Sequence, residues 1–374
     1  MRLVALERVE HGARLGRDVW GGASGDIPLL RAGARLGAPY IERLREGGIA
    51  AVFVDDELSA GINVPTALRE QTRRQVGKAL GVAFDRLPGV ATKGASPIGQ
   101  GLTAELNDAV RAILADLEAS GDAVVAFADL ATVDAYTMQH SVNVAVIGLV
   151  IGRRLFRDFG WIDHTGGRRF DGLGERLVQL GLGLLLHDIG KLAIPADILQ
   201  RSGPLDDEEW KLIRAHPAAG VAMLKGDLIG ARAKSVVRSH HERHDGSGYP
   251  QGLQGDDIPQ LARIADVADV YDAITSERPY RSAAPASVGV VEIVAGSGIL
   301  FDEEVVTAFR AVVAPYPAGT SVTLSDGREG IVSSVPPERA DRPVVRVVTD
   351  ANGNRISPPE EVALADEQEL QISG

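Results

Sequence analysis

The sequence contains no cysteine among its 374 residues. This absence excludes a disulfide scaffold, a thiolate metal site and a cysteine nucleophile, and it fits a reducing compartment. Net positive charge is also lacking, because the formal net charge is −12 and the isoelectric point is about 5.2. A broad basic surface for nucleic acid is therefore not expected. A small anionic ligand would need a local cluster of cations, or a metal, to overcome this field.

Long hydrophobic runs are absent as well. The most apolar stretches, 142–151 and 177–186, have about ten residues each, whereas a membrane-spanning helix needs about 20. Glu7, Arg8 and Glu10 stand where a signal peptide would have its apolar segment. We therefore expect a cytoplasmic protein without a membrane span.

The chain is long enough for two or three domains, at about 150 residues each. We predict a small mixed α/β module with a helical connector at 1–86, a Pro-, Gly- and Ser-rich linker at 87–101, an all-helical catalytic domain at 102–314 and a small β module at 315–374. The fold class is thus mainly α. After a first helix from Thr103, helical periodicity predicts helices at 138–156, 175–188, 206–213, 217–223, 229–242, 259–275, 286–296 and 302–313.

Histidines and aspartates form one ordered set within the helical region. Its members are His140, His187, Asp188, His216, His240, His241, Asp266, Asp269 and Asp272. Imidazole and carboxylate together suit Fe, Mn, Zn or Ni. The set has the right size for two metals that share one bridging carboxylate.

The stretch 177–186 is apolar all round, which is typical of a buried helix. Its end places His187 and Asp188 in a region of low dielectric, where a bound cation would remove the cost of burying the carboxylate. The alternative is a satisfied His–Asp pair that ends a core helix. Lys191 adds a cation on the same rim, and phosphate is a natural partner for it.

Each remaining motif also allows a structural interpretation. His240 and His241 could be a surface doublet, and His216 could merely open a helix before a proline. The three aspartates recur every three residues, so they share one helix face and suggest one ligand flanked by supporting acids. In the Gly-rich segment 241–253, Tyr249 could stack on a base. The two cations that follow the aspartates are either ligand contacts or ordinary surface charge: Arg278 and Arg281.

Together these segments resemble the HD-GYP family, which belongs to the HD superfamily of metal-dependent phosphohydrolases. The resemblance covers roughly 124–314, and its motifs are HDIGK at 187–191, His216-Pro217, HHERHDGSGYP at 240–250 and ADVADVYDAITSERPYR at 265–281. The tail after 315 resembles the short β tail that often follows this domain. The resemblance implies hydrolysis of cyclic di-GMP to pGpG, GMP or both, in bacterial second-messenger signalling.

The resemblance also implies roles for individual residues. Asp188 would bridge two divalent ions, Fe or Mn, and the other metal ligands would be His140, His187, His216, His240, His241 and Asp269. Lys191, Arg278 and Arg281 would hold phosphates, and Tyr249 would contact substrate. Asp272 would handle protons. Some members hold a third metal through a Glu four residues before the first His; this chain has Tyr136 there, so we expect two.

The spacing from His140 to His187 is longer than usual for the family. We expect the additional segment, 159–172, to lie near the active-site rim or at an interface, and its His164 not to be a ligand. Possible partners are diguanylate cyclase (GGDEF) domains and a second copy of the chain. The GGDEF domains would bind the GYP loop, which is the Gly-rich segment 241–253 with Gly-Tyr-Pro at 248–250. Two alternatives stay open: hydrolysis of another nucleotide, such as cyclic GMP-AMP, and a non-catalytic adaptor. The GYP loop argues against (p)ppGpp, and the complete ligand set argues against an adaptor.

Overall fold

A computed structural model describes residues 1–20, 28–47, 49–93, 100–120, 136–163, 165–199, 201, 203–224, 229–276, 283–337 and 339–373. The chain forms two compact units. One contains Leu68–Ala119 and Tyr136–Arg310, and the other contains Met1–Ala67 together with Ala311–Gly374. These units divide the chain differently from the four segments expected from the sequence.

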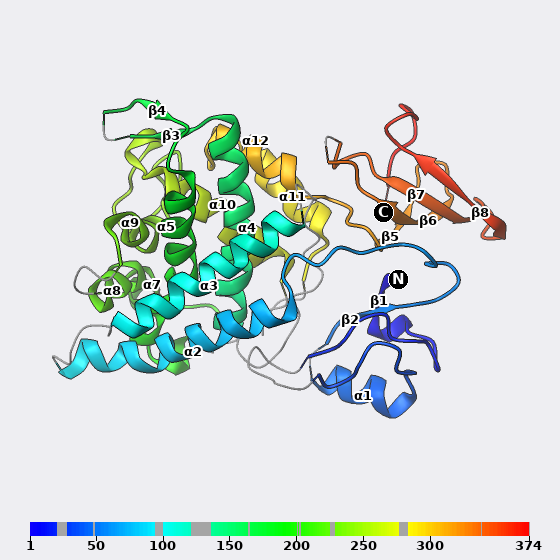
Figure 1. The fold of residues 1–374 in the computed structure, drawn as a ribbon, viewed down its shortest axis with the longest axis horizontal. Coiled ribbons are helices and arrows are strands. Elements are labelled where there is room, and N and C mark those ends of the chain that lie inside the picture. The colour runs from blue at the N-terminus through cyan, green and yellow to red at the C-terminus, as the bar shows by residue number, and fades with distance from the viewer. Residues whose placement is uncertain are drawn as a thin grey trace. The chain divides into compact units, whose positions relative to one another are not determined.

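The first unit is helical (Figure 1). Its elements are α2 (Glu70–Lys93), α3 (Gln100–Ala119), α4 (Tyr136–Asp158), α5 (Leu173–Leu186), η2 (Ile189–Ala193), α6 (Ala196–Leu199), α7 (Asp207–Arg214), α8 (His216–Met223), α9 (Ala231–Ser239), η3 (Gly255–Asp257), α10 (Gln260–Thr275), α11 (Ala286–Ala295) and α12 (Glu303–Val312). The mainly α fold class is confirmed, and the predicted helix bounds are correct to within a few residues. The expected linker differs, because α2 extends to Lys93 and α3 begins at Gln100.

Two antiparallel helices, α4 and α5, form the centre of this unit. Gly148 and Gly152 on α4 face α5 so closely that a Cβ at either position would lie 2.5 Å from a methyl carbon of Leu184 or Leu180. The small residues therefore let the two helices approach each other. This packing brings the beginning of α4, with His140, next to the end of α5, with His187.

The segment between α4 and α5 contains a short hairpin, β3 (Trp161–Ile162) and β4 (Arg168–Arg169), which the helical prediction did not include. Arg168 forms an ion pair with Glu304 at 2.6 Å, which ties the hairpin to α12. The hairpin follows the end of α4, about 27 Å along that helix from His140 at 1.5 Å per residue. The hairpin therefore lies at the end of α4 away from His140 and not at the active-site rim, and the alternative of an interface stays a prediction. His164 lies outside the described residues.

The second unit combines both ends of the chain. Its elements are β1 (Arg2–Ala5), η1 (Leu6–Arg8), α1 (Ala38–Glu46), β2 (Ala51–Val54), β5 (Ser321–Thr323), β6 (Glu329–Ser334), β7 (Val344–Thr349) and β8 (Arg355–Ala363). β1 pairs with β2, and the other strands form an antiparallel sheet in the order β5-β6-β7-β8. Phe53, Ile62 and Val64 pack with Ile331 and Val348 in one hydrophobic cluster. The two modules that the sequence suggested thus share a core.

Candidate metal centre

The turn after α5 carries two buried polar side chains, His187 and Asp188, each 1% exposed. Gly190 follows within η2, and a Cβ at this position would lie 1.9 Å from the carbonyl oxygen of His216 and 2.5 Å from the amide nitrogen of Gly220. Only glycine allows this turn to lie against α8. The contact brings His216, the first residue of α8, beside Asp188.

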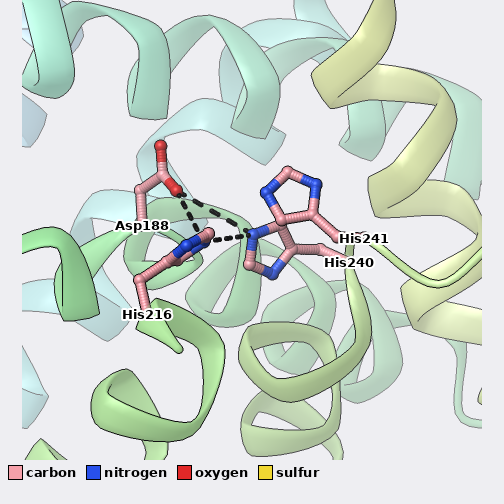
Figure 2. A group of neighbouring side chains, drawn as sticks. All are labelled: Asp188, His216, His240 and His241. Atoms are coloured by element: carbon pink, nitrogen blue, oxygen red, sulfur yellow. Dashed lines mark hydrogen bonds and ion pairs between the residues drawn. The ribbon is translucent and has the colours of Figure 1, made fainter. Parts of the chain in front are cut away.

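All seven predicted ligands come together from five places in the helical unit. They form two groups of potential ligand atoms, each with its atoms within 4.8 Å of one another: His140, His187 and Asp269 in one, and Asp188, His216, His240 and His241 in the other. Figure 2 shows the second group, with the His216 and His240 rings converging on the Asp188 carboxylate. The convergence favours a metal site over a surface doublet at His240 and His241, and His216 both begins α8 and faces this group.

Asp188 lies between the two groups, and each of its oxygens faces one of them. Its Oδ2 is 3.4 Å from Nε2 of His187 and 3.6 Å from Nε2 of His140. Its Oδ1 is 3.3 Å from Nε2 of His216 and 3.9 Å from Nε2 of His240. This is the arrangement expected of a carboxylate that two cations share.

Three of the histidines are oriented by their own backbone. Nδ1 of His187, His216 and His240 donates to a carbonyl oxygen three residues earlier, at 2.7, 2.6 and 3.0 Å: Leu184, Ile213 and Val237. A carbonyl can only accept, so the proton sits on Nδ1 and the Nε2 lone pair points into the cluster. Nε2 of His216 and Nε2 of His240 are only 3.2 Å apart. Two lone pairs at that distance repel unless a cation lies between them.

Asp188 supplies the test of whether a metal fits. Its Oδ1 is buried and has no hydrogen-bond partner among the described residues, a situation that costs about 1–3 kcal/mol or more for a charged group. Burial alone would raise the pKa of Asp188, but Lys191 and His187 hold it well below its usual value. The buried carboxylate is therefore ionised and incompletely neutralised. A divalent cation in each group would satisfy it.

The histidine pKa values agree with this interpretation. Burial lowers the pKa of His241 to about 3 and that of His240 well below its usual value, so both rings are neutral, as metal binding would require. Burial also lowers the pKa of His140, but Asp269 and Asp272 outweigh it and raise the pKa to about 9. The surroundings of His140 thus favour a positive charge, which a metal would supply in place of the proton.

Comparison with known proteins agrees with this centre. A family model described as an HD domain matches residues 174–305, and one described as a KOW domain associated with HD domain matches 321–374. The cyclic di-GMP phosphodiesterase PA4108 of Pseudomonas aeruginosa is 34% identical over 335 residues, which are 82% of this chain and 76% of that protein. The chain belongs to the HD-GYP family.

Two relatives that match a shorter part of the chain are also named as cyclic-dinucleotide phosphodiesterases. The cyclic di-GMP phosphodiesterase response regulator RpfG of Xanthomonas campestris is 43% identical over 39% of this chain and 40% of its own length. The 3'3'-cGAMP-specific phosphodiesterase 3 of Vibrio cholerae is 37% identical over 40% of this chain and 29% of its own length. Relatives named for two different cyclic dinucleotides therefore each match about 40% of this chain.

Within this HD-GYP site, Asp272 contacts the far side of a predicted ligand. Its Oδ2 is 2.6 Å from Nδ1 of His140, and its Oδ1 accepts hydrogen bonds from Asn143 Nδ2 and Ser276 Oγ, both at 2.7 Å. The carboxylate is 2% exposed. These contacts fix the His140 ring with its Nε2 toward Asp188. Sequence reasoning singled out Asp272 but missed Asn143, which lies one helical turn after His140 and so had a positional signal.

The GYP loop is held by a residue that the sequence analysis did not single out. Glu242 is 1% exposed, and its carboxylate accepts hydrogen bonds from the backbone amides of Gln251 at 2.8 Å and Leu253 at 2.9 Å. Arg243 forms an ion pair with the buried Asp266 at 2.6 Å, so Asp266 supports the loop from α10. One ion pair and two backbone hydrogen bonds to a buried carboxylate thus hold the loop beside His241.

Of the four residues predicted to contact substrate, the structure describes Lys191 and Tyr249, and both lie beside the candidate metal centre. Lys191 Nζ lies 2.6 Å from Asp188 Oδ2, with 29% of the side chain exposed. The Tyr249 ring lies 4.7 Å from the His241 ring, measured between centroids, and is tilted by 34° to it. Arg278 and Arg281 lie outside the described residues. Tyr136 begins α4, but its side chain is not among those described.

No helix in the described parts of the chain combines the length and the apolar composition needed to cross a membrane.

Proposed function

We propose that this HD-GYP protein is a metal-dependent phosphodiesterase that hydrolyses cyclic di-GMP to pGpG, GMP or both. The observation that supports this most is Asp188, a buried and ionised carboxylate with one oxygen facing each of two histidine-rich groups. The relatives from P. aeruginosa and X. campestris are both named as cyclic di-GMP phosphodiesterases.

An HD domain implies dependence on divalent metal, and we propose two ions, Fe or Mn. His140, His187 and Asp269 would hold one, and His216, His240 and His241 the other, with Asp188 shared. Such ions polarise a phosphoryl oxygen and lower the pKa of a water molecule. Imidazole with carboxylate suits these metals, and the chain has no thiolate to favour a softer one.

The chain's own residues orient and stabilise charge at this site. Lys191 provides a fixed cation beside Asp188, where the negative charge of a phosphodiester would arrive. Tyr249 presents an aromatic ring next to His241. We propose that Asp272 acts through His140, by holding the proton on Nδ1. This contact supports a positioning role and not direct proton donation. Arg278 and Arg281 are proposed phosphate contacts on sequence grounds alone.

A second cyclic dinucleotide is a specific alternative substrate. Relatives from Vibrio cholerae named as specific for 3'3'-cGAMP are 37% and 48% identical to this chain over 40% and 26% of its length. A non-catalytic adaptor is disfavoured because all seven ligands converge. We further propose that the protein acts in the cytoplasm, that the GYP loop can bind GGDEF domains and that the chain can form a homodimer.

Metal analysis and turnover of cyclic di-GMP by the purified full chain test this function. Asp188→Ala should lose both metal and turnover, because it removes the ligand common to the two groups. Asp108→Ala, on the exposed face of α3, is the matched control and should behave as wild type. Metal-loaded wild-type protein that hydrolyses neither cyclic di-GMP nor 3'3'-cGAMP would refute the proposal.

A further inference from the structure

Arg214, the last residue of α7, lies two positions before the ligand His216. Its side chain is exposed and has no hydrogen bond or ion pair within the part of the chain that the structure describes. Two other cations near the centre are paired: Lys191 with Asp188, and Arg243 with Asp266. In a chain with a net charge of −12, a guanidinium beside the site without a carboxylate partner is available to a ligand.

Two aromatic rings flank this guanidinium. Its central carbon lies 5.7 Å from the centroid of the Tyr249 ring and 5.9 Å from that of the Trp210 ring. Trp210 precedes Arg214 by one helical turn, and 45% of its surface is exposed. Cation–π contacts hold a guanidinium through its flat face and use none of its N–H donors. The five donors of Arg214 therefore remain free for recognition.

The position of Arg214 relative to the metal ligands indicates which part of a substrate it meets. The Tyr249 ring contacts both sides: its centroid lies 4.7 Å from the His241 ring and 6.4 Å from the His216 ring, and 5.7 Å from the Arg214 guanidinium carbon. If a phosphate binds at these histidines, the base of its nucleoside can reach the Tyr249 ring and, next to that ring, Arg214 and Trp210.

We infer that Arg214 is a specificity-determining residue that binds the O6 and N7 acceptors of a substrate guanine, while Trp210 offers a stacking surface to the base. This inference rests on the proposed function. Guanine presents two adjacent acceptors that match the arginine fork, whereas adenine presents an amino donor in place of O6. Arg214 thus favours cyclic di-GMP over a dinucleotide that carries adenine.

Selectivity of an Arg214→Gln variant tests this inference, because glutamine pairs with adenine as arginine pairs with guanine. The measurement is kcat/KM of the metal-loaded full chain for cyclic di-GMP, 3'3'-cGAMP and bis(p-nitrophenyl) phosphate. We expect the value for cyclic di-GMP to fall about tenfold or more and the value for 3'3'-cGAMP to fall less. The loss on the ester, which has no base, should be at most about twofold. Arg310→Gln, at an exposed position of α12, is the control and should change none of the three.

Equal losses on both dinucleotides would overturn the inference, because a phosphate contact would not distinguish the bases. The inference would also fail if the active variant kept the wild-type ratio of kcat/KM for cyclic di-GMP to kcat/KM for 3'3'-cGAMP. Trp210→Ala provides a second check. It should raise KM for both dinucleotides by a similar factor, since every base has a face that can stack. A wild-type protein inactive on both dinucleotides would refute the proposed function, a result distinct from unchanged selectivity.

Discussion

Replacing Gly190 with alanine should move His216 away from Asp188 within the metal centre. The new Cβ would lie 1.9 Å from the carbonyl oxygen of His216, at a position where real Cβ atoms keep at least 3.0 Å. The η2 turn and α8 must therefore move apart by about 1.1 Å, the difference between these distances. The obstacle is backbone on both sides, so no rotamer change can relieve it. Overpacking of this kind costs about 1–3 kcal/mol of unfolding free energy.

The same displacement is large compared with the geometry of the site. Oδ1 of Asp188 is 3.3 Å from Nε2 of His216, and a misplacement of about 1 Å in a catalytic constellation can reduce the rate about 100-fold. We therefore expect Gly190→Ala to lose metal from the His216 group and to lose turnover by about two orders of magnitude.

Denaturant unfolding, metal analysis and turnover of cyclic di-GMP, measured side by side, would check this prediction. Gly174→Ala in α5 is the control, because a Cβ there meets no atom within 4 Å. Alanine at that position should be neutral or stabilise by up to about 1 kcal/mol. A Gly190→Ala protein with the wild-type unfolding midpoint and metal content would refute the reasoning about backbone contact.

Three further predictions concern neighbouring groups. Glu242→Gln should lower the unfolding free energy by about 1.5–3 kcal/mol, because one backbone amide of the GYP loop loses its charged acceptor; chemical denaturation against the exposed control Asp245→Asn would measure this. Asp272→Asn should weaken metal binding about 10- to 100-fold through loss of the carboxylate that orients His140, which titration with Mn²⁺ would detect; unchanged affinity would contradict it. Addition of Mn²⁺ at about 100 times its Kd should stabilise the wild-type protein by about 2.7 kcal/mol but leave Asp188→Ala unaffected in a thermal melt.

Much of the helical unit could be predicted from the sequence because its signals are local. The apolar run 177–186 indicated a buried helix, and the structure buries every residue of it except Gln179. The clustering of the seven proposed ligands was predictable for a similar reason, since each belongs to a short motif with fixed spacing. His140 had the weakest local signal of the seven, and its assignment depended on the family resemblance.

The features that the sequence did not reveal depend on contacts between distant segments. Asn143 is notable only because Asp272, 129 residues later, accepts its hydrogen bond. The loop-supporting role of Glu242 depends on a chain reversal that brings two amides back to it. The β3–β4 hairpin has two residues in each strand, too few for an alternating pattern to be recognised. Arg214 belongs to none of the motifs in the sequence, and only its aromatic neighbours Trp210 and Tyr249 single it out.

The shared core of the second unit has a consequence for the order of folding. Phe53, Ile62 and Val64 are buried partly by Ile331 and Val348, so the amino-terminal segment cannot complete its core until nearly all of the chain has been synthesised. The helical unit has no such requirement, because its sequence is contiguous apart from residues 120–135. The helical unit can therefore fold first, while Phe53, Ile62 and Val64 wait for strands made more than 250 residues later. A chain truncated before β6 would leave these apolar side chains exposed to solvent and to other chains.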